Sequence, residues 1–216
     1  MKRIAMLMGS HPIDTINIYP VLRGLEGIEI YPQPLDCLLY DFGGTNDEYD
    51  GYLFYCMPLL PPKPDEKFGD LPKTPADTFY RLGEDGKGIT VLHHGLVAFP
   101  GLKMWNEVTG ITDRSFEYFG DMDIDVHIAD KKCPITEGIA DWTLKDETFR
   151  YAGGLDKSCT PVLTTDLKES APVIAWTHEY KNSRVFCFNQ GHDAAPFRDD
   201  SFTEVLRRGI LWSTEH

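Results

Sequence analysis

The sequence predicts an α/β protein with a doubly wound, mainly parallel sheet and additional, partly antiparallel strands. Three observations support this class. In the first hundred residues, short apolar runs alternate with helical periodicity, as in strands joined by crossover helices. Polar residues directly follow three of the apolar runs, as expected where parallel strands end at a ligand-binding or catalytic site. The stretch 121–188 is instead dominated by strand patterns.

The elements of the N-terminal half follow from local patterns. Residues 3–8 form a continuous apolar run that is typical of a buried parallel strand. Residues 16–25 carry apolar side chains at helical spacing. Thr74 as N-cap and Pro75 at the first helical position predict a second helix, which would end near residue 82. Further strands are expected at 27–31, 52–57 and 88–92.

The remaining chain predicts a loop, five strands and a closing helix. Residues 58–73 are too rich in proline for regular structure, so we expect an active-site flap or a variable surface loop. Ser201 and Glu204 have the spacing of a capping box at the start of the last helix. The expected strands, beside or above the main sheet, are 123–128, 142–151, 161–165, 172–177 and 184–189.

Composition limits the classes of partner. A chain of 216 residues predicts one domain, 1–216. Lys+Arg 21 against Asp+Glu 34 gives a net charge of −13, which is unfavourable for binding nucleic acid or an anionic membrane. No export signal or membrane-spanning run is recognisable. The five cysteines form no C-x-x-C pair, which favours reduced thiols in a cytoplasmic protein.

Three polar clusters follow predicted strands. They are Gly9-Ser10-His11, His93-His94-Gly95 and the segment 189–193 with His192 and Asp193. Loops at the carboxyl ends of parallel strands converge on one crevice, so these histidines are expected to meet. Adjacent residues of an extended segment point to opposite sides. We therefore expect only one of His93 and His94 to face the crevice, unless the chain turns sharply there.

Converging histidines allow three interpretations. Neutral imidazoles with a carboxylate bind zinc or a similar divalent metal, and His94, His192 and Asp193 are the candidate ligands. Without a metal, the same histidines suit acid–base catalysis or substrate hydrogen bonding near neutral pH. Asp146 and Glu147 are further candidate carboxylates. The third interpretation is that the histidines have a purely structural role. No Walker loop or G-x-S-x-G elbow is present, and we expect no nucleotide cofactor.

Two aromatic features also have alternative interpretations. Trp105 could stack on a sugar ring in a substrate site or pack in the core. Phe116, Tyr118 and Phe119 could form the interface of a homodimer or higher homo-oligomer, or a core cluster.

Several segments together resemble the ThuA-like (trehalose utilisation) family. They are G-I-T-V-L-H-H-G (88–95), C-P-I-T-E-G-I (133–139), L-K-D-E-T-F (144–149) and the stretch 173–212 around N-Q-G-H-D. The resemblance implies the flavodoxin-like, three-layer fold of class I glutamine amidotransferases. In true amidotransferases a cysteine nucleophile occupies the turn after the fourth strand. His93 stands there in this chain, so we expect no glutaminase activity.

The resemblance also implies a function in trehalose and related disaccharide metabolism, including routes through keto-sugars. It places His94, Glu147, His192 and Asp193 on recurrent polar positions, with His11 at the strand–Gly–His opening. The leading hypothesis is a sugar isomerase, lyase or hydrolase. A divalent metal on His94, His192 and a carboxylate would polarise a carbonyl, while His93 or Glu147 moves the proton. The alternatives are a non-catalytic sugar-binding or regulatory module, and a metal-dependent hydrolase that does not act on sugars.

Overall fold

The sheet of this protein is mixed, with one half made of parallel strands and the other half made of antiparallel strands. The computed structural model describes residues 1–65, 69 and 74–215, and within them one sheet has the strand order β2-β1-β3-β4-β9-β8-β7-β5-β6. The pairs from β2 to β9 are parallel and those from β9 to β6 are antiparallel. The strands are β1 (Lys2–Gly9), β2 (Ile28–Pro34), β3 (Gly51–Cys56), β4 (Gly88–Leu92), β5 (Phe116–Ile128), β6 (Trp142–Tyr151), β7 (Thr160–Thr164), β8 (Val173–Tyr180) and β9 (Ser183–Phe188).

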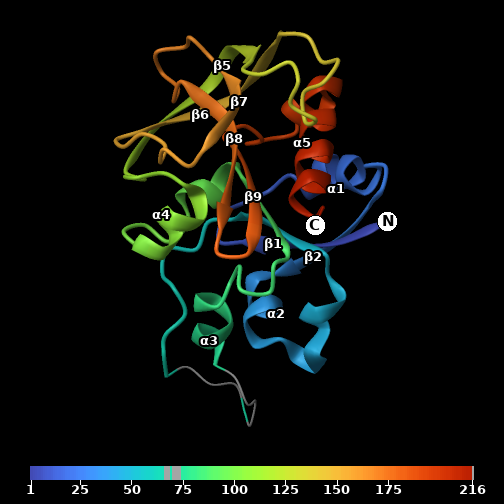
Figure 1. The fold of residues 1–216 in the computed structure, drawn as a ribbon, viewed down its shortest axis with the longest axis vertical. Helices are drawn as coiled ribbons and strands as arrows, with labels where there is room; N and C mark the ends of the chain where they lie inside the picture. The colour runs from blue at the N-terminus through green and yellow to red at the C-terminus, as the bar shows by residue number, and fades with distance from the viewer. Residues whose placement is uncertain (66–68, 70–73, 216) are drawn as a thin grey trace.

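Helices cover both faces of the parallel half, as the predicted fold class requires (Figure 1). α1 (Thr15–Arg23) and α5 (Asp200–Ser213) pack into one apolar cluster with β1 and β3. The other face is covered by α2 (Leu35–Tyr40), α3 (Pro75–Tyr80) and α4 (Lys103–Thr109). The sequence did not predict α2 and α4, because helices of six or seven residues are too short to show a clear period.

The strand-rich stretch continues the main sheet and does not form a layer above it. β5 begins at Phe116, several residues before the expected start, and its register with β6 shifts between Phe119 and Met122. A bulge of this kind interrupts the alternation that the sequence pattern relies on.

One of the two predicted helix caps is correct. Thr74 caps α3 in a capping box with Asp77. The expected Ser201–Glu204 capping box is wrong, because the Asp199 side chain caps α5 by accepting from the backbone N–H of Phe202 at 2.8 Å. Glu204 instead forms ion pairs with arginines one turn further along the helix.

The proline-rich loop agrees with the expectation over the part that is described. Residues 58–65 and 69 have no regular structure, and the rest of 58–73 lies outside the described residues. No helix in the described part of the chain is both long and apolar enough to cross a membrane.

Candidate functional site

The loops after β1, β4 and β9 meet at the carboxyl edge of the parallel strands. The ring of His11 stacks on that of His94, with centroids 3.7 Å apart. The ring centroid of His94 lies 4.4 Å from that of His93 and 5.2 Å from that of His192. Side chains from three distant parts of the sequence therefore form one cluster, as the strand-end argument predicted.

Both His93 and His94 face this cluster, whereas an extended chain would have turned one of them away. His93 has a φ of 42°, in the left-handed region, and begins the 3₁₀ turn η2 (His93–Val97). The turn brings Gly95 against β3, where a Cβ atom would lie only 2.4 Å from the carbonyl oxygen of Phe54. The sharp turn therefore requires a residue without a side chain at position 95, and it directs two consecutive imidazoles to one place.

The hydrogen bonds of His93 define its tautomer. Its Nδ1 lies 2.6 Å from the carbonyl oxygen of Asn189, which can only accept. Nδ1 therefore carries the proton, and the lone pair of Nε2 points towards Nδ1 of His192, 3.2 Å away. The ring of Phe149 stacks on His93 at 4.4 Å and fixes its plane.

Glu147 adds a carboxylate between two of the histidines. Its Oε1 lies 3.4 Å from Nε2 of His93 and 3.3 Å from Nδ1 of His192. Burial alone would raise the pKa of Glu147, but its contacts with His192 and His93 lower that pKa to about 2. The hydrogen bond with Glu147 in turn raises the pKa of His192. Nδ1 of His192 therefore donates its proton to Glu147 Oε1 when no metal is bound, and a metal ion would take the place of this proton.

His94 is the least satisfied residue of the cluster. Both of its ring nitrogens are buried, and neither has a hydrogen-bond partner among the described residues. Burial, followed by the nearby His93, His11 and His192, lowers the pKa of His94 to about 2, so the ring is neutral. A buried imidazole without a partner is rare in folded proteins, which indicates a missing ligand.

The cluster has the donor set of a three-histidine metal site. His93, His94 and His192 each contribute one ring nitrogen, and these atoms all lie within 4.8 Å of one another. Neutral imidazoles of this kind bind zinc and similar ions. The third ligand in this group is therefore His93, whereas the sequence analysis named Asp193.

Asp193 and Trp105 lie outside this set. The Asp193 Oδ1 accepts a hydrogen bond from the backbone N–H of Ala195 at 2.7 Å, beside the cluster. Trp105 is fully buried, and its indole N–H donates to the Gly95 carbonyl at 2.8 Å. The expectation that Trp105 stacks on a substrate is therefore wrong, because the ring packs beneath the turn after β4.

A buried carboxylate that we considered only as a general candidate holds the His192 loop in place. Asp146 is 4% exposed, and its carboxylate accepts from the backbone N–H groups of Gly191 at 2.6 Å and His192 at 3.2 Å. The Tyr55 hydroxyl donates to the Gly191 carbonyl on the other side. Burial raises the pKa of Asp146 to about 6. No local sequence signal identified this role, because the partners are 45 and 46 residues away.

A polar hollow of about 410 Å³ opens beside His192 and Glu147. Asp121, Lys145 and Asp193 line it, with Gly120 as a small wall residue. Lys145 is paired with Asp121 at 3.1 Å, so acidic groups outnumber free cations there. Such a lining offers many hydrogen bonds to hydroxyl groups.

The fold is a doubly wound α/β sandwich in which histidines gather at the ends of the parallel strands, with His93 and His94 in the turn after β4. The chain belongs to the ThuA family, described as trehalose utilisation, whose family model matches residues 68–213. No curated protein sequence matches the chain.

Solved structures share the fold at low sequence identity. A putative ThuA-like protein from Parabacteroides merdae has a TM-score of 0.72 at 14% identity, over 99% of this chain and 90% of that one. A cytoplasmic protein from Salmonella typhimurium has a TM-score of 0.67 at 12% identity, over 99% of both chains. A putative GMP synthase subunit from Thermoplasma acidophilum has a TM-score of 0.58 at 15% identity, over 98% of this chain and 93% of that one.

Proposed function

We propose that this protein is a carbohydrate-processing enzyme that acts on a disaccharide or keto-glycoside. The observation that carries the proposal is the buried His94 ring, whose nitrogens have no partner among the described residues. A nitrogen of this ring lies within 4.8 Å of nitrogens of His93 and His192, and His192 lines a hollow with hydrogen-bonding walls. Membership of the trehalose utilisation family supports a sugar as the substrate class.

The chemistry that suits this arrangement is proton transfer next to a carbonyl. It leads to isomerisation or to elimination of the glycosidic group as an alcohol, and addition of water to the eliminated product completes a net hydrolysis. Glu147 Oε1 is within 3.4 Å of both His93 and His192, so a proton taken from the substrate has two imidazoles to which it can pass. His94 orients the carbonyl oxygen. His11 and Asp193 flank the cluster and bind hydroxyl groups of the sugar.

A divalent metal fits the same residues. His93, His94 and His192 would hold it, and their neutral nitrogens match the preferences of zinc. When bound, such an ion would act as a Lewis acid on the substrate carbonyl. A nucleotide cofactor is not required by this chemistry, and a glutaminase reaction would lack its cysteine nucleophile at position 93.

A comparison of two histidine variants tests the proposal. The His94→Ala variant removes the unpartnered ring, whereas His127→Ala removes a more exposed ring that is bonded to Asp141 away from the cluster. We expect wild type and His127→Ala to convert a keto-glycoside, or to exchange the proton next to its carbonyl with D₂O, as followed by NMR. The His94→Ala variant should lose at least about 100-fold in rate, in line with loss of a positioned acid–base group.

Two results would contradict the proposed enzyme. The first is a folded His94→Ala variant that turns over keto-glycosides at the wild-type rate. The second is saturable binding of a disaccharide by calorimetry without any product, which would favour a sugar-binding or regulatory module. Activity on ester or amide substrates alone would favour a hydrolase that does not act on sugars.

We further propose that the protein acts in the cytoplasm and forms a homo-oligomer. The five cysteines are all free thiols, and the similar Salmonella protein is described as cytoplasmic. Tyr118 is 67% exposed beside the partly exposed Phe116, which supports β5 as the contact between protomers. Light scattering on the Tyr118→Ser variant should show a smaller particle than wild type. Nucleic acid and membranes are not expected partners at a net charge of −13.

A further inference from the structure

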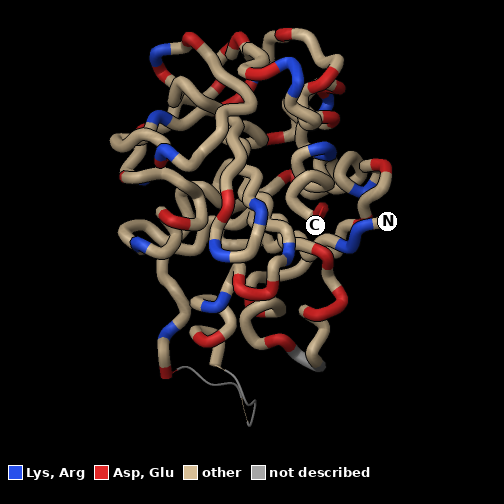
Figure 2. The backbone as a smooth tube through the Cα atoms, in the orientation of Figure 1, with Lys and Arg blue, Asp and Glu red and all other residues tan. Residues whose placement is uncertain are grey.

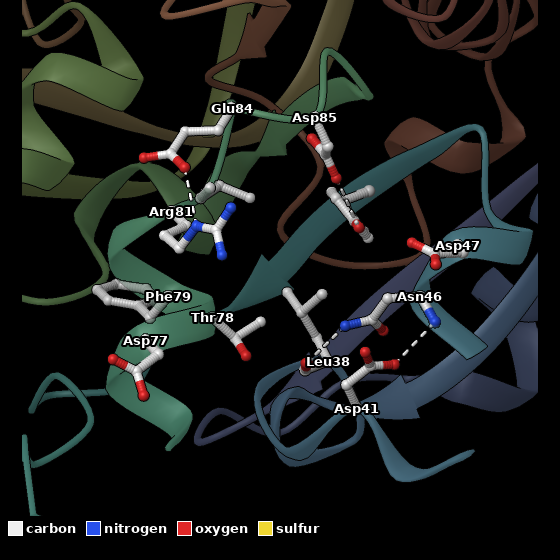
Figure 3. A pocket seen from close by; sticks show the side chains of 12 residues that line it. Leu38, Asp41, Asn46, Asp47, Asp77, Thr78, Phe79, Arg81, Glu84 and Asp85 are labelled. Carbon is white, nitrogen blue, oxygen red and sulfur yellow. Dashed lines mark hydrogen bonds and ion pairs between the residues drawn. The ribbon is translucent and has the colours of Figure 1, made fainter. Parts of the chain in front are cut away.

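A second cavity lies at the amino ends of the parallel strands, whereas the histidine cluster lies at their carboxyl ends. It has a volume of about 250 Å³ and is bounded by α2, α3 and the segments that precede β3 and β4 (Figure 3). Tyr52, at the start of β3, forms part of its wall, whereas the histidines follow the ends of β1, β4 and β9. The length of the parallel strands therefore separates the two sites.

The cavity is strongly acidic. Its walls include Asp41, Asp47, Asp85 and Glu84, against the single cation Arg81. The Arg81 Nε is already paired with Glu84 at 2.8 Å, and the guanidinium lies among the lining side chains in Figure 3. Among the described residues, no ion pair joins Asp41, Asp47 or Asp85 to a lysine or arginine. Figure 2 shows the same excess of acidic residues along the chain around α2.

A buried acceptor in the same cavity also lacks a partner. Asn46 is only 8% exposed, and its Nδ2 donates to the Leu38 carbonyl at 2.8 Å. This bond fixes the amide orientation, so the remaining atom is the oxygen. Asn46 Oδ1 is buried without a hydrogen-bond partner in the described part of the protein, and its side chain extends into the cavity in Figure 3. A buried unpaired acceptor calls for a ligand with N–H or O–H donors.

The arrangement of the carboxylates favours an organic cation over a metal ion. Within the described residues, only the three-histidine cluster brings three ligating groups within 4.8 Å. The acidic groups here come from separate segments of the chain and line different parts of the cavity wall. Leu38, Phe79 and Leu82 supply buried apolar walls, which suit a short aliphatic chain.

We propose that this cavity binds an alkylammonium group, with the ammonium near Asn46, Asp47 and Asp85 and the methylene chain against the apolar walls. The ammonium has three N–H donors for the unpaired amide oxygen and the carboxylates. A free linear diamine and a lysine side chain of another protein both carry this chemistry. The site is independent of the proposed sugar chemistry, because it shares no residue with the histidine cluster.

Calorimetry at about 150 mM salt with cadaverine and with Nα-acetyl-lysine amide tests the proposal, since salt at this level screens general attraction to an acidic surface. The double variant Asp47→Asn/Asp85→Asn removes two cavity charges. Its control, Asp123→Asn/Asp166→Asn, removes two charges elsewhere on the surface and changes the net charge equally. We expect one saturable site per chain, with affinity lowered at least tenfold in the cavity variant and unchanged in the control.

The relative affinities of the two compounds distinguish the two sources of the alkylammonium group. Tighter binding of cadaverine indicates a free amine as the ligand, and tighter binding of the lysine derivative indicates a protein side chain. If neither compound shows saturable binding, or if both double variants lose affinity equally, the proposal is overturned. These results do not depend on the histidine variants, so failure here leaves the proposed sugar chemistry untouched.

Discussion

His93 and Asn189 are joined by a hydrogen bond of 2.6 Å between the imidazole Nδ1 and the backbone carbonyl oxygen. The contact links the turn after β4 to the loop after β9. It determines which nitrogen of His93 carries the proton, and therefore which one offers a lone pair to His192 and to a ligand. Because the acceptor is a backbone carbonyl, the bond survives any side-chain substitution at Asn189 that preserves the loop.

Zinc should stabilise the protein through the histidine cluster. A ligand that binds only the folded state at about 100 times its Kd contributes about 2.7 kcal/mol. We expect zinc to raise the Tm of the wild type and of His127→Ala, and a chelator to reverse the shift. The His94→Ala variant should show no shift in differential scanning fluorimetry. A shift of equal size in that variant would locate the zinc elsewhere.

The Asp146→Ala variant should be less stable. It leaves the buried backbone N–H of Gly191 and the partly buried N–H of His192 without their acceptor, at a cost of about 2–4 kcal/mol in the free energy of unfolding. Urea denaturation measures this loss, and Asp123→Ala at an exposed position is the control. A loss below about 0.5 kcal/mol, which is typical of surface substitutions, would mean that Asp146 does not hold the loop.

Replacing Gly95 should disturb the turn after β4. The added methyl of Gly95→Ala would lie 2.4 Å from the Phe54 carbonyl oxygen, a backbone atom that cannot rotate away. Overpacking of this kind costs about 1–3 kcal/mol. Gly154→Ala is the matched control, because its Cβ would meet nothing within 4 Å. We expect only the Gly95 variant to lower the midpoint of unfolding, and similar midpoints would contradict the close packing.

Trp105 should matter for stability and not for ligand binding. The Trp105→Phe variant loses the hydrogen bond from the indole to Gly95 and some packing volume, which together cost about 1–3 kcal/mol. Because the ring has no exposed surface, the affinity for a sugar should be unchanged when measured by calorimetry well below the Tm. A weaker affinity with unchanged stability would restore Trp105 as a substrate residue.

Glu204 should make the protein sensitive to acid. Hydrogen bonds from Arg207 and, after the opposing effect of burial, from Arg208 lower the pKa of Glu204 to about 2 from an ordinary 4.5. A carboxyl group with a lowered pKa in the folded state contributes stability above about pH 4.5 and loses it as the pH falls towards 2. The group is partly exposed, so the contribution is at most about 1 kcal/mol. The Tm of Glu204→Gln should therefore fall less than that of wild type between pH 5 and pH 2.5, and parallel curves would contradict the assignment.

Local sequence patterns predicted strands and helix ends correctly where the pattern depends only on residues within that segment. The apolar runs of β1 and β4 predicted strands, and Thr74 predicted the cap of α3, because these features depend on residues that are neighbours in sequence. The start of α5 was misassigned, because Asp199 and Ser201 are both residue types that cap helices. The chain path through the preceding 3₁₀ turn selected Asp199.

The sequence by itself determined the α/β class, the polar loops at the strand ends and the convergence of His11, His94 and His192. Only the tertiary structure decided that His93 joins them, that Asp146 holds their loop and that Trp105 lies beneath the turn. Strand ends are a property of local hydrophobic pattern, so they can be read along the chain. The direction of an imidazole depends on one left-handed turn and on partners some 45 to 99 residues away, and these contacts exist only after the sheet has formed.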